Sequence, residues 1–292
     1  MKKHSSLLIA FMLLWDAVAT FAATPKYTIR LYENNQPQYQ NGFTAEDEWV
    51  ERKDRIYKIS DPRLNIYLPE GGKAKGILLS IPGGGYRFVS SGNEGTQVAD
   101  FFVPRNYAVA VLKYRLPNQH ENVPLEDALQ AMRILRDSAA QWAIEKAAVG
   151  VMGFSAGGHL AASLLTHYTD SMTRPDFGVL VYPVISMDDE ITHKGSCKHL
   201  LGETPTPEQR NYWSAEKQVT ADTPPCLIVT CQDDPTVQIA NSIRFYEALT
   251  AHKVPSSLVI VPVGKHGWGF SRQFPDREII DQAIISFMAQ YT

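Results

Sequence analysis

One junction, at residues 146–168 (KAAVGVMGFSAGGHLAASLLTHY), constrains the fold of this chain more than any other feature. The apolar run Val149–Met152 predicts a short buried strand, and from Ala156 onward leucine and alanine recur at helical spacing. The segment Gly153–Gly157, with Ser155 at its centre, therefore lies on a tight turn between a strand and a helix. Such a junction is typical of folds in which strands alternate with helices.

The rest of the chain repeats this alternation. Short apolar runs predict strands at residues 63–69, 75–82, 107–114, 176–183, 225–231 and 256–262. Amphipathic runs predict helices at residues 94–104, 124–142, 239–249 and 277–288. Repeated strand–helix units form a mostly parallel sheet with helices on both faces. We therefore predict a single α/β domain over residues 23–292, with an insertion over the sheet edge near residues 186–223, where the alternation breaks.

Composition excludes several classes of partner. The chain has 292 residues, of which 44% are hydrophobic and 20% charged, and its formal net charge is -3. These values are ordinary for a globular domain large enough to bury a core. No basic run is longer than a pair, so we expect neither nucleic acid nor an anionic membrane as a partner.

The N-terminus predicts export. Lys2 and Lys3 precede an apolar run at residues 7–15, and Ala19 and Ala22 offer cleavage points, as in a secretory signal peptide. The apolar run is too short to span a membrane, so no membrane insertion is expected after cleavage. We predict a signal peptide at residues 1–22 and a periplasmic or secreted protein; a frayed N-terminal helix is the alternative.

The cysteines do not indicate a disulfide framework. Cys226 and Cys231 belong to one predicted strand, which holds them too far apart to bond to each other. Only Cys197 could bridge to either of them, and three cysteines leave at least one unpaired. We expect buried thiols that pack as small apolar side chains.

The turn at Ser155 has the G-x-S-x-G arrangement of a nucleophile held between a strand and a helix. The nucleophile occupies a strained backbone conformation, and the residues two before and two after it must be small so that strand and helix can approach. The backbone N–H of Ala156 then faces the position of a developing oxyanion. A dinucleotide fingerprint would need glycine in place of Ser155, and no G-K-[ST] follows the glycines, so nucleotide binding is not expected.

A candidate acid and a candidate histidine follow Ser155 along the chain. The order serine, acid, histidine is typical of α/β-hydrolases. Asp233 and Asp234 follow the predicted strand 225–231, and His266 follows the predicted strand 256–262 between two glycines. Either aspartate could orient His266. We favour Asp234, because a valine three residues later anchors the turn, while Asp233 is expected to bond turn backbone.

A glycine-rich loop follows the predicted strand 75–82. Its residues 82–86 are PGGGY, and we predict that backbone N–H groups of this loop, Gly84 and Gly85 in particular, complete an oxyanion hole with Ala156. A plain flexible turn is the alternative. The sequence has neither an H-E-x-x-H motif nor clustered cysteine ligands, so we expect no metal and no cofactor.

These motifs also carry a resemblance. The segments PGGGYRFVSSGNEG, VPLEDALQAMRILRDSAAQW, GVMGFSAGGHLAAS, DDPTV and HGWGF are similar to those of the secreted α/β-hydrolase esterases of the acetylxylan-esterase and feruloyl-esterase-like group. The similarity runs from about residue 63 to 287, and residues 24–60 resemble nothing recognisable. It implies Ser155 as nucleophile, His266 as base, one aspartate of DDPTV as acid, and an acetylated plant polysaccharide or oligosaccharide as substrate.

Tyr86 and Trp268, with Tyr212 and Trp213 of the insertion, are candidates for a wall that stacks against sugar rings. Two alternatives to a serine esterase stay open: a glycan-binding module with a hydrolase-like fold, and a small serine peptidase.

Overall fold

The computed structural model describes residues 24–33, 35–52, 54–71, 73–142, 144, 148–271 and 273–292. The predicted signal peptide, residues 1–22, lies outside the described residues. Within those ranges, no helix is both long and apolar enough to cross a membrane.

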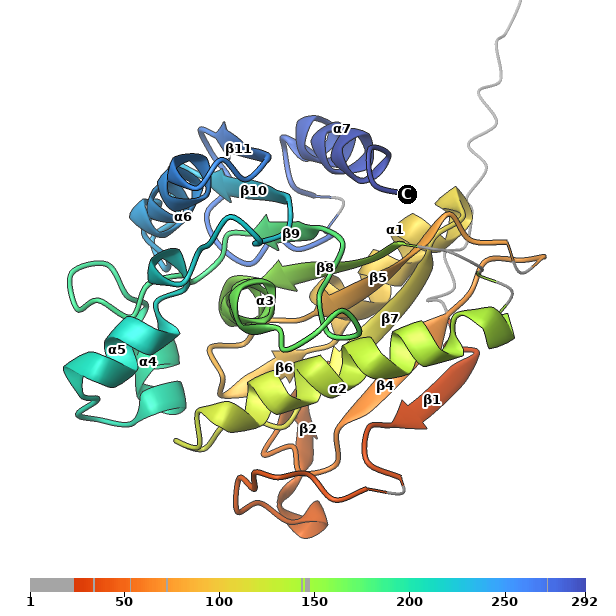
Figure 1. Ribbon diagram of the computed structural model, residues 1–292, viewed down its shortest axis with the longest axis horizontal. Helices are drawn as coiled ribbons and strands as arrows, with labels where there is room; N and C mark the ends of the chain where they lie inside the picture. The colour runs from red at the N-terminus through yellow and green to blue at the C-terminus, as the bar shows by residue number, and fades with distance from the viewer. Residues whose placement is uncertain are drawn as a thin grey trace, which may run out of the picture.

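A central eight-stranded sheet organises the described part of the chain (Figure 1). Its strands are β1 (Tyr27–Arg30), β4 (Arg63–Tyr67), β5 (Gly76–Ile81), β7 (Ala108–Lys113), β8 (Ala148–Phe154), β9 (Gly178–Val181), β10 (Cys226–Cys231) and β11 (Ser256–Val261). They lie in the order β1-β4-β7-β5-β8-β9-β10-β11. Pairing is antiparallel from β1 to β7 and parallel from β7 to β11, which confirms the predicted mostly parallel sheet.

Helices cover both faces of the sheet, as predicted. They are α1 (Gln97–Phe102), α2 (Asn122–Ser138), α3 (Ser155–His167), α4 (Lys194–Leu201), α5 (Pro207–Trp213), α6 (Ala240–Ala251) and α7 (Arg277–Met288). The apolar sides of α2, α3 and α6 pack in one buried cluster and those of α1 and α7 in another, with the sheet between them. Strands β5 and β10 are buried along their whole length and mostly apolar, because both of their faces are covered.

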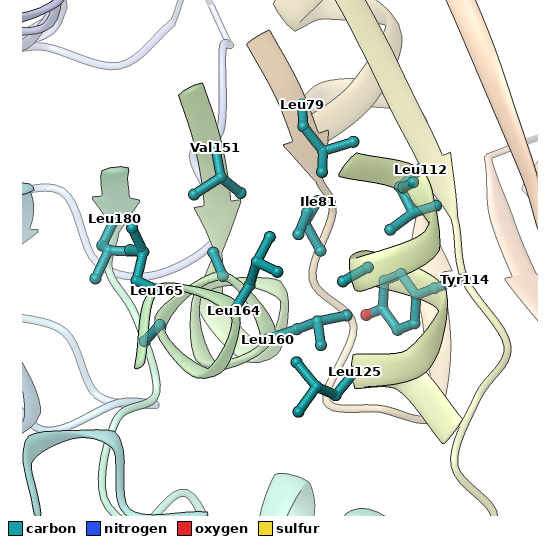
Figure 2. Packing of buried hydrophobic residues seen from close by; sticks show 14 of the residues in the cluster. Leu79, Ile81, Leu112, Tyr114, Leu125, Val151, Leu160, Leu164, Leu165 and Leu180 are labelled. Atoms are coloured by element: carbon teal, nitrogen blue, oxygen red, sulfur yellow. The ribbon is translucent and has the colours of Figure 1, made fainter. Parts of the chain in front are cut away.

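The helix that carries the serine turn is held by this packing. Figure 2 shows Leu160, Leu164 and Leu165 of α3 directed toward Val151 and Leu180 on the strands and toward neighbouring apolar side chains. All three leucines are at most 1% exposed. Burying a leucine side chain contributes about 1.5–3 kcal/mol, so α3 is a rigid support for the residue at its N-terminus.

Two regions differ from the expectations. The predicted helix 94–104 is divided into a π-helical turn (Gly92–Thr96), the short α1, and a 3-10 turn (Val103–Arg105). Residues 24–60, which the sequence left without assignment, contribute β1 and two strands of a separate sheet. That small sheet has the order β2-β3-β6, with β2 (Trp49–Glu51), β3 (Arg55–Tyr57) and β6 (Phe88–Ser90).

The cysteines follow the expectation. Cys197, Cys226 and Cys231 are all free and buried. Burial raises the pKa of Cys231 to about 11, so its thiol stays protonated at neutral pH. The three thiols pack as small apolar side chains.

Candidate active site

Ser155 stands at the sharp turn between β8 and α3. Its φ is +52°, a left-handed conformation that non-glycine residues rarely adopt. A Cβ on Gly157 would lie 2.2 Å from the Ile81 carbonyl oxygen, and a Cβ on Gly153 would lie 2.4 Å from the Gly157 carbonyl oxygen. The glycines of G-x-S-x-G are therefore required by the close approach of backbone, as the sequence predicted.

A chain of hydrogen bonds joins three of the predicted residues. His266 Nε2 lies 2.8 Å from Ser155 Oγ, and His266 Nδ1 lies 2.6 Å from Asp234 Oδ2. A carboxylate only accepts hydrogen bonds, so Nδ1 carries the proton and Nε2 is left to accept from the serine hydroxyl. The Asp234 side chain is fully buried, and its Oδ1 accepts the backbone N–H groups of Thr236 and Val237 at 2.8 and 3.0 Å.

Asp233 has a different role. Its Oδ1 accepts the backbone N–H groups of Gly264 and Lys265, both at 2.8 Å. These two residues begin the loop that carries His266. Asp233 thus bonds backbone, as expected, but it ties its own turn to the neighbouring loop.

The glycine-rich loop presents unused donors beside this chain. Gly84 and Gly85 have φ values of +131° and +63°, which favour glycine. The backbone N–H groups of Gly84, Gly85 and Ala156 make no hydrogen bond in the part of the chain that the structure describes. Gly83 differs, because its N–H donates to the Glu94 carboxylate at 2.7 Å and is not available to a ligand.

Glu94 is a site residue that the sequence analysis missed. It is 4% exposed and lies in the π-helical turn, a feature often found at functional sites. Its second oxygen accepts the Tyr182 hydroxyl at 2.8 Å, and the oxygen of that hydroxyl accepts the N–H of Gly269 at 2.8 Å. Glu94 therefore connects the glycine-rich loop to the loop that carries His266. In the sequence, the one feature that could have indicated Glu94 is its position between Gly92 and Gly95 in the segment PGGGYRFVSSGNEG.

The electrostatics of this connection follow from burial. Desolvation raises the pKa of Glu94, and the hydrogen bonds from Tyr182 and Gly83 oppose that rise. Desolvation, followed by the neighbouring Glu94, raises the pKa of Tyr182 well above its usual value. Tyr182 therefore stays protonated and donates to the carboxyl, and its ring centroid lies 4.7 Å from that of His266.

None of the four aromatic candidates for a sugar-stacking wall lines the cavity that contains Ser155. Tyr86 is 2% exposed, and its hydroxyl is 2.7 Å from His159 Nδ1. Trp268 is 7% exposed and stacks on Phe274, and Trp213 is 3% exposed. Tyr212 is exposed but lines a different cavity. The rings of Trp213 and Trp268 are largely covered by packing, whereas Tyr86 lines a second cavity.

A cavity of about 520 Å³ opens over Ser155. Its lining includes Gly84, Gly85 and His266, as expected, and also Arg87, His193 and His199, which the sequence analysis did not single out. Burial, followed by the nearby His266 and His199, lowers the pKa of His193. The cavity is within the range of about 300–1,000 Å³ that is usual for small-molecule sites.

A strained serine between strand and helix, with acid and histidine after the next strands, defines the α/β-hydrolase fold. The comparisons agree. A crystal structure of an acetyl ester-xyloside bifunctional hydrolase from Caldicellulosiruptor lactoaceticus is 32% identical with a TM-score of 0.75, over 90% of this chain and 97% of that one.

Curated relatives point to the same group. An acetylxylan esterase of Xylanibacter ruminicola is 40% identical over 71% of this chain and 44% of its own length. An endo-1,4-beta-xylanase B of Butyrivibrio fibrisolvens is 37% identical over 70% of this chain and 34% of its own length. The chain thus spans less than half of the length of each of these two relatives. The BD-FAE family model matches residues 64–249, and the chain belongs to that family.

Proposed function

We propose that this chain is a serine carboxylic-ester hydrolase that removes acetyl groups from xylan or its oligosaccharides. The observation that carries the proposal is the hydrogen-bonded chain from Ser155 through His266 to Asp234, at 2.8 and 2.6 Å, in a cavity. In this proposal Ser155 is the nucleophile, His266 the general base and Asp234 the residue that orients the imidazole.

The reaction has two halves. His266 Nε2 takes the proton of Ser155 as Oγ attacks the ester carbonyl, and the sugar hydroxyl leaves with that proton. The free N–H groups of Gly84, Gly85 and Ala156 stabilise the oxyanion, and their preorganisation requires no movement at the moment of reaction. Water, activated by His266, then attacks the acetyl-serine and releases acetate.

The substrate class rests on similarity. One relative is named an acetylxylan esterase and another an acetyl ester-xyloside bifunctional hydrolase, and the motifs quoted above resemble acetylxylan esterases. We extend that class to this chain as part of the proposal. Action outside the cytoplasm, periplasmic or secreted, and the lack of a nucleic-acid partner stay predictions from the sequence.

The test combines a simple ester and a natural one. Wild-type protein is expected to release p-nitrophenol from p-nitrophenyl acetate and acetate from acetylated xylo-oligosaccharides. Ser155→Ala should lower kcat by about 10⁶ while the protein keeps its fold, as judged by circular dichroism. If Ser155→Ala retains more than about a hundredth of the wild-type activity, Ser155 is not the nucleophile. No activity of the wild type on either ester would favour a glycan-binding module instead.

A further inference from the structure

A second cavity, of about 320 Å³, lies beside the one over Ser155. Arg87 and His199 line both cavities, so the two adjoin at these side chains. The second cavity is lined by Trp49 and Tyr57 of the small sheet, by residues near that sheet, and by residues of the segments 116–119 and 198–203. Part of this lining comes from residues 24–60, where the sequence offered no assignment.

Aromatic rings form a ladder on the small sheet between the two cavities. Trp49 of β2 is paired directly with Tyr57 of β3, and Tyr57 with Phe88 of β6. Directly opposite residues lie on the same face of a sheet. The ring centroids of Trp49 and Tyr57 are 4.0 Å apart with an interplanar angle of 5°, and those of Tyr57 and Phe88 are 5.3 Å apart.

The ladder leads outward from the serine. Phe88 lines the cavity over Ser155, whereas Trp49 and Tyr57 line the second cavity. Tyr57 is 8% exposed, but Trp49, at the outer end, is 47% exposed. One face of the Trp49 ring is stacked on Tyr57, and the exposed part of the ring is an apolar surface on which a ligand can pack.

Polar groups at the junction have unused hydrogen-bonding capacity. His199 Nδ1 lies 2.9 Å from the Gly85 carbonyl oxygen, which only accepts, so Nδ1 is the donor. In the neutral ring, Nε2 is then an acceptor, and it has no partner among the described residues. Arg87 is exposed, and its guanidinium makes no ion pair or hydrogen bond in the same described ranges. Hydroxyl groups of a neutral ligand match this pairing of donor and acceptor.

We propose that the second cavity is a subsite for the sugar rings that flank the acetylated one. The proposal rests on the proposed function, which places the scissile ester at Ser155. The flat ring of Trp49 covers the apolar C–H face of a pyranose, while Arg87 and His199 bond hydroxyls at the junction of the cavities. The enzyme thereby recognises an oligosaccharide chain rather than an isolated acetylated sugar.

The test is the Trp49→Ala variant measured on three acetate esters. On acetylated xylotetraose, kcat/KM should fall about tenfold, which corresponds to about 1.4 kcal/mol. On p-nitrophenyl acetate and on acetylated xylose, which do not reach Trp49, kcat/KM should stay within about twofold of wild type. Trp49→Phe, which keeps an aromatic face, should recover most of the loss.

The adjacent Val50 provides a matched control. It is 55% exposed on the same strand, does not line either cavity, and Val50→Ala should leave all three rates unchanged. An equal loss of kcat/KM on all three esters in Trp49→Ala would mean that the ring supports the fold of the site, which would overturn the subsite. An unchanged kcat/KM on acetylated xylotetraose would overturn it as well. A selective loss on methyl ferulate would assign the cavity to an aromatic acyl group instead.

Failure of the proposed function can be told apart from failure of the subsite. If wild-type protein cleaves p-nitrophenyl acetate but no acetylated xylan fragment, the substrate class is wrong. Calorimetric titration of wild type and Trp49→Ala with unacetylated xylotetraose then decides the subsite independently. Binding by wild type that Trp49→Ala weakens about tenfold supports it, and absence of binding by wild type overturns it.

Discussion

Replacing Asp234 by asparagine should inactivate this chain through a change of tautomer. Asp234 Oδ1 accepts two backbone N–H groups, from Thr236 and Val237, so the carbonyl oxygen of an asparagine must take that position. Its NH₂ group then faces His266 Nδ1 in place of the carboxylate oxygen that lies at 2.6 Å. Nδ1 would have to accept, and the imidazole proton would move to Nε2.

A protonated Nε2 cannot take the proton of Ser155. The corresponding change in a serine protease lowers kcat by about 10⁴ with the geometry intact, and we expect a similar loss here. That factor corresponds to about 5.4 kcal/mol in the barrier. The amide preserves both backbone hydrogen bonds, so thermal stability should change little.

Asp233→Asn is the matched control. Its Oδ1 accepts from Gly264 and Lys265, and an asparagine oxygen can accept from both as well. We expect kcat within about tenfold of wild type, because only the strength of charge-assisted hydrogen bonds to the loop is reduced. The assay is kcat for p-nitrophenyl acetate at pH 7 to 8. A larger loss at position 233, or a loss below tenfold at position 234, would refute the reasoning.

Three other predictions follow from the site and its surroundings. Glu94→Gln replaces one acceptor oxygen with an NH₂ group, so either the Tyr182 hydroxyl or the Gly83 N–H loses its acceptor. One buried hydrogen bond left unmade costs about 1–3 kcal/mol. We expect kcat to fall about tenfold, less than the about 10²–10³ for loss of an oxyanion-hole donor, and rates equal to wild type would contradict a positioning role. Acetyl esters should be cleaved faster than longer acyl esters, since each added methylene is worth about 1–3 kcal/mol in discrimination; a rate maximum at octanoate in a p-nitrophenyl ester series would contradict the carbohydrate substrate. Burial lowers the pKa of His159 from 6.5 to about 4. As pH drops from 6.5 toward 4, His159 therefore binds a proton in the unfolded chain but not in the folded one, and the free energy of unfolding falls. Chemical denaturation at several pH values should show a shallower fall of that free energy in His159→Gln, and an equal fall in both proteins would disprove the prediction.

The order of strands and helices and the central pair of the site were predictable from the sequence. Apolar runs of strand length and amphipathic runs of helix length are local signals, so the last helix was predicted at the observed bounds, 277–288. The need for glycine at position 153 is also local, because a Cβ there would meet the Gly157 carbonyl of the same turn, whereas the need at position 157 comes from the end of β5 at Ile81. Ser155 and His266 meet because parallel strands deliver their following loops to one edge of the sheet.

Contacts between distant segments were decided only by the tertiary structure. Glu94 meets Tyr182 across 88 positions of sequence, and nothing near either residue indicates that partner. Tyr86 follows three glycines that suggest an open loop, yet its φ of +58° and its bond to His159 turn the ring inward. The orientation of a loop side chain depends on the backbone angles of the loop. Glycine allows many such angles, so packing against distant segments determines which of them the loop adopts.

In the region before residue 60, too, local sequence did not predict the structure, and contacts with distant segments determine it. Its strands β2 and β3 have three residues each, too few for a periodic pattern to be recognised. β6, which follows the glycine-rich loop, pairs with β3, and β3 in turn pairs with β2, which aligns Trp49 and Tyr57 with Phe88. Short strands are stabilised by cross-strand contacts rather than by their own propensity, and those contacts exist only once the chain has folded.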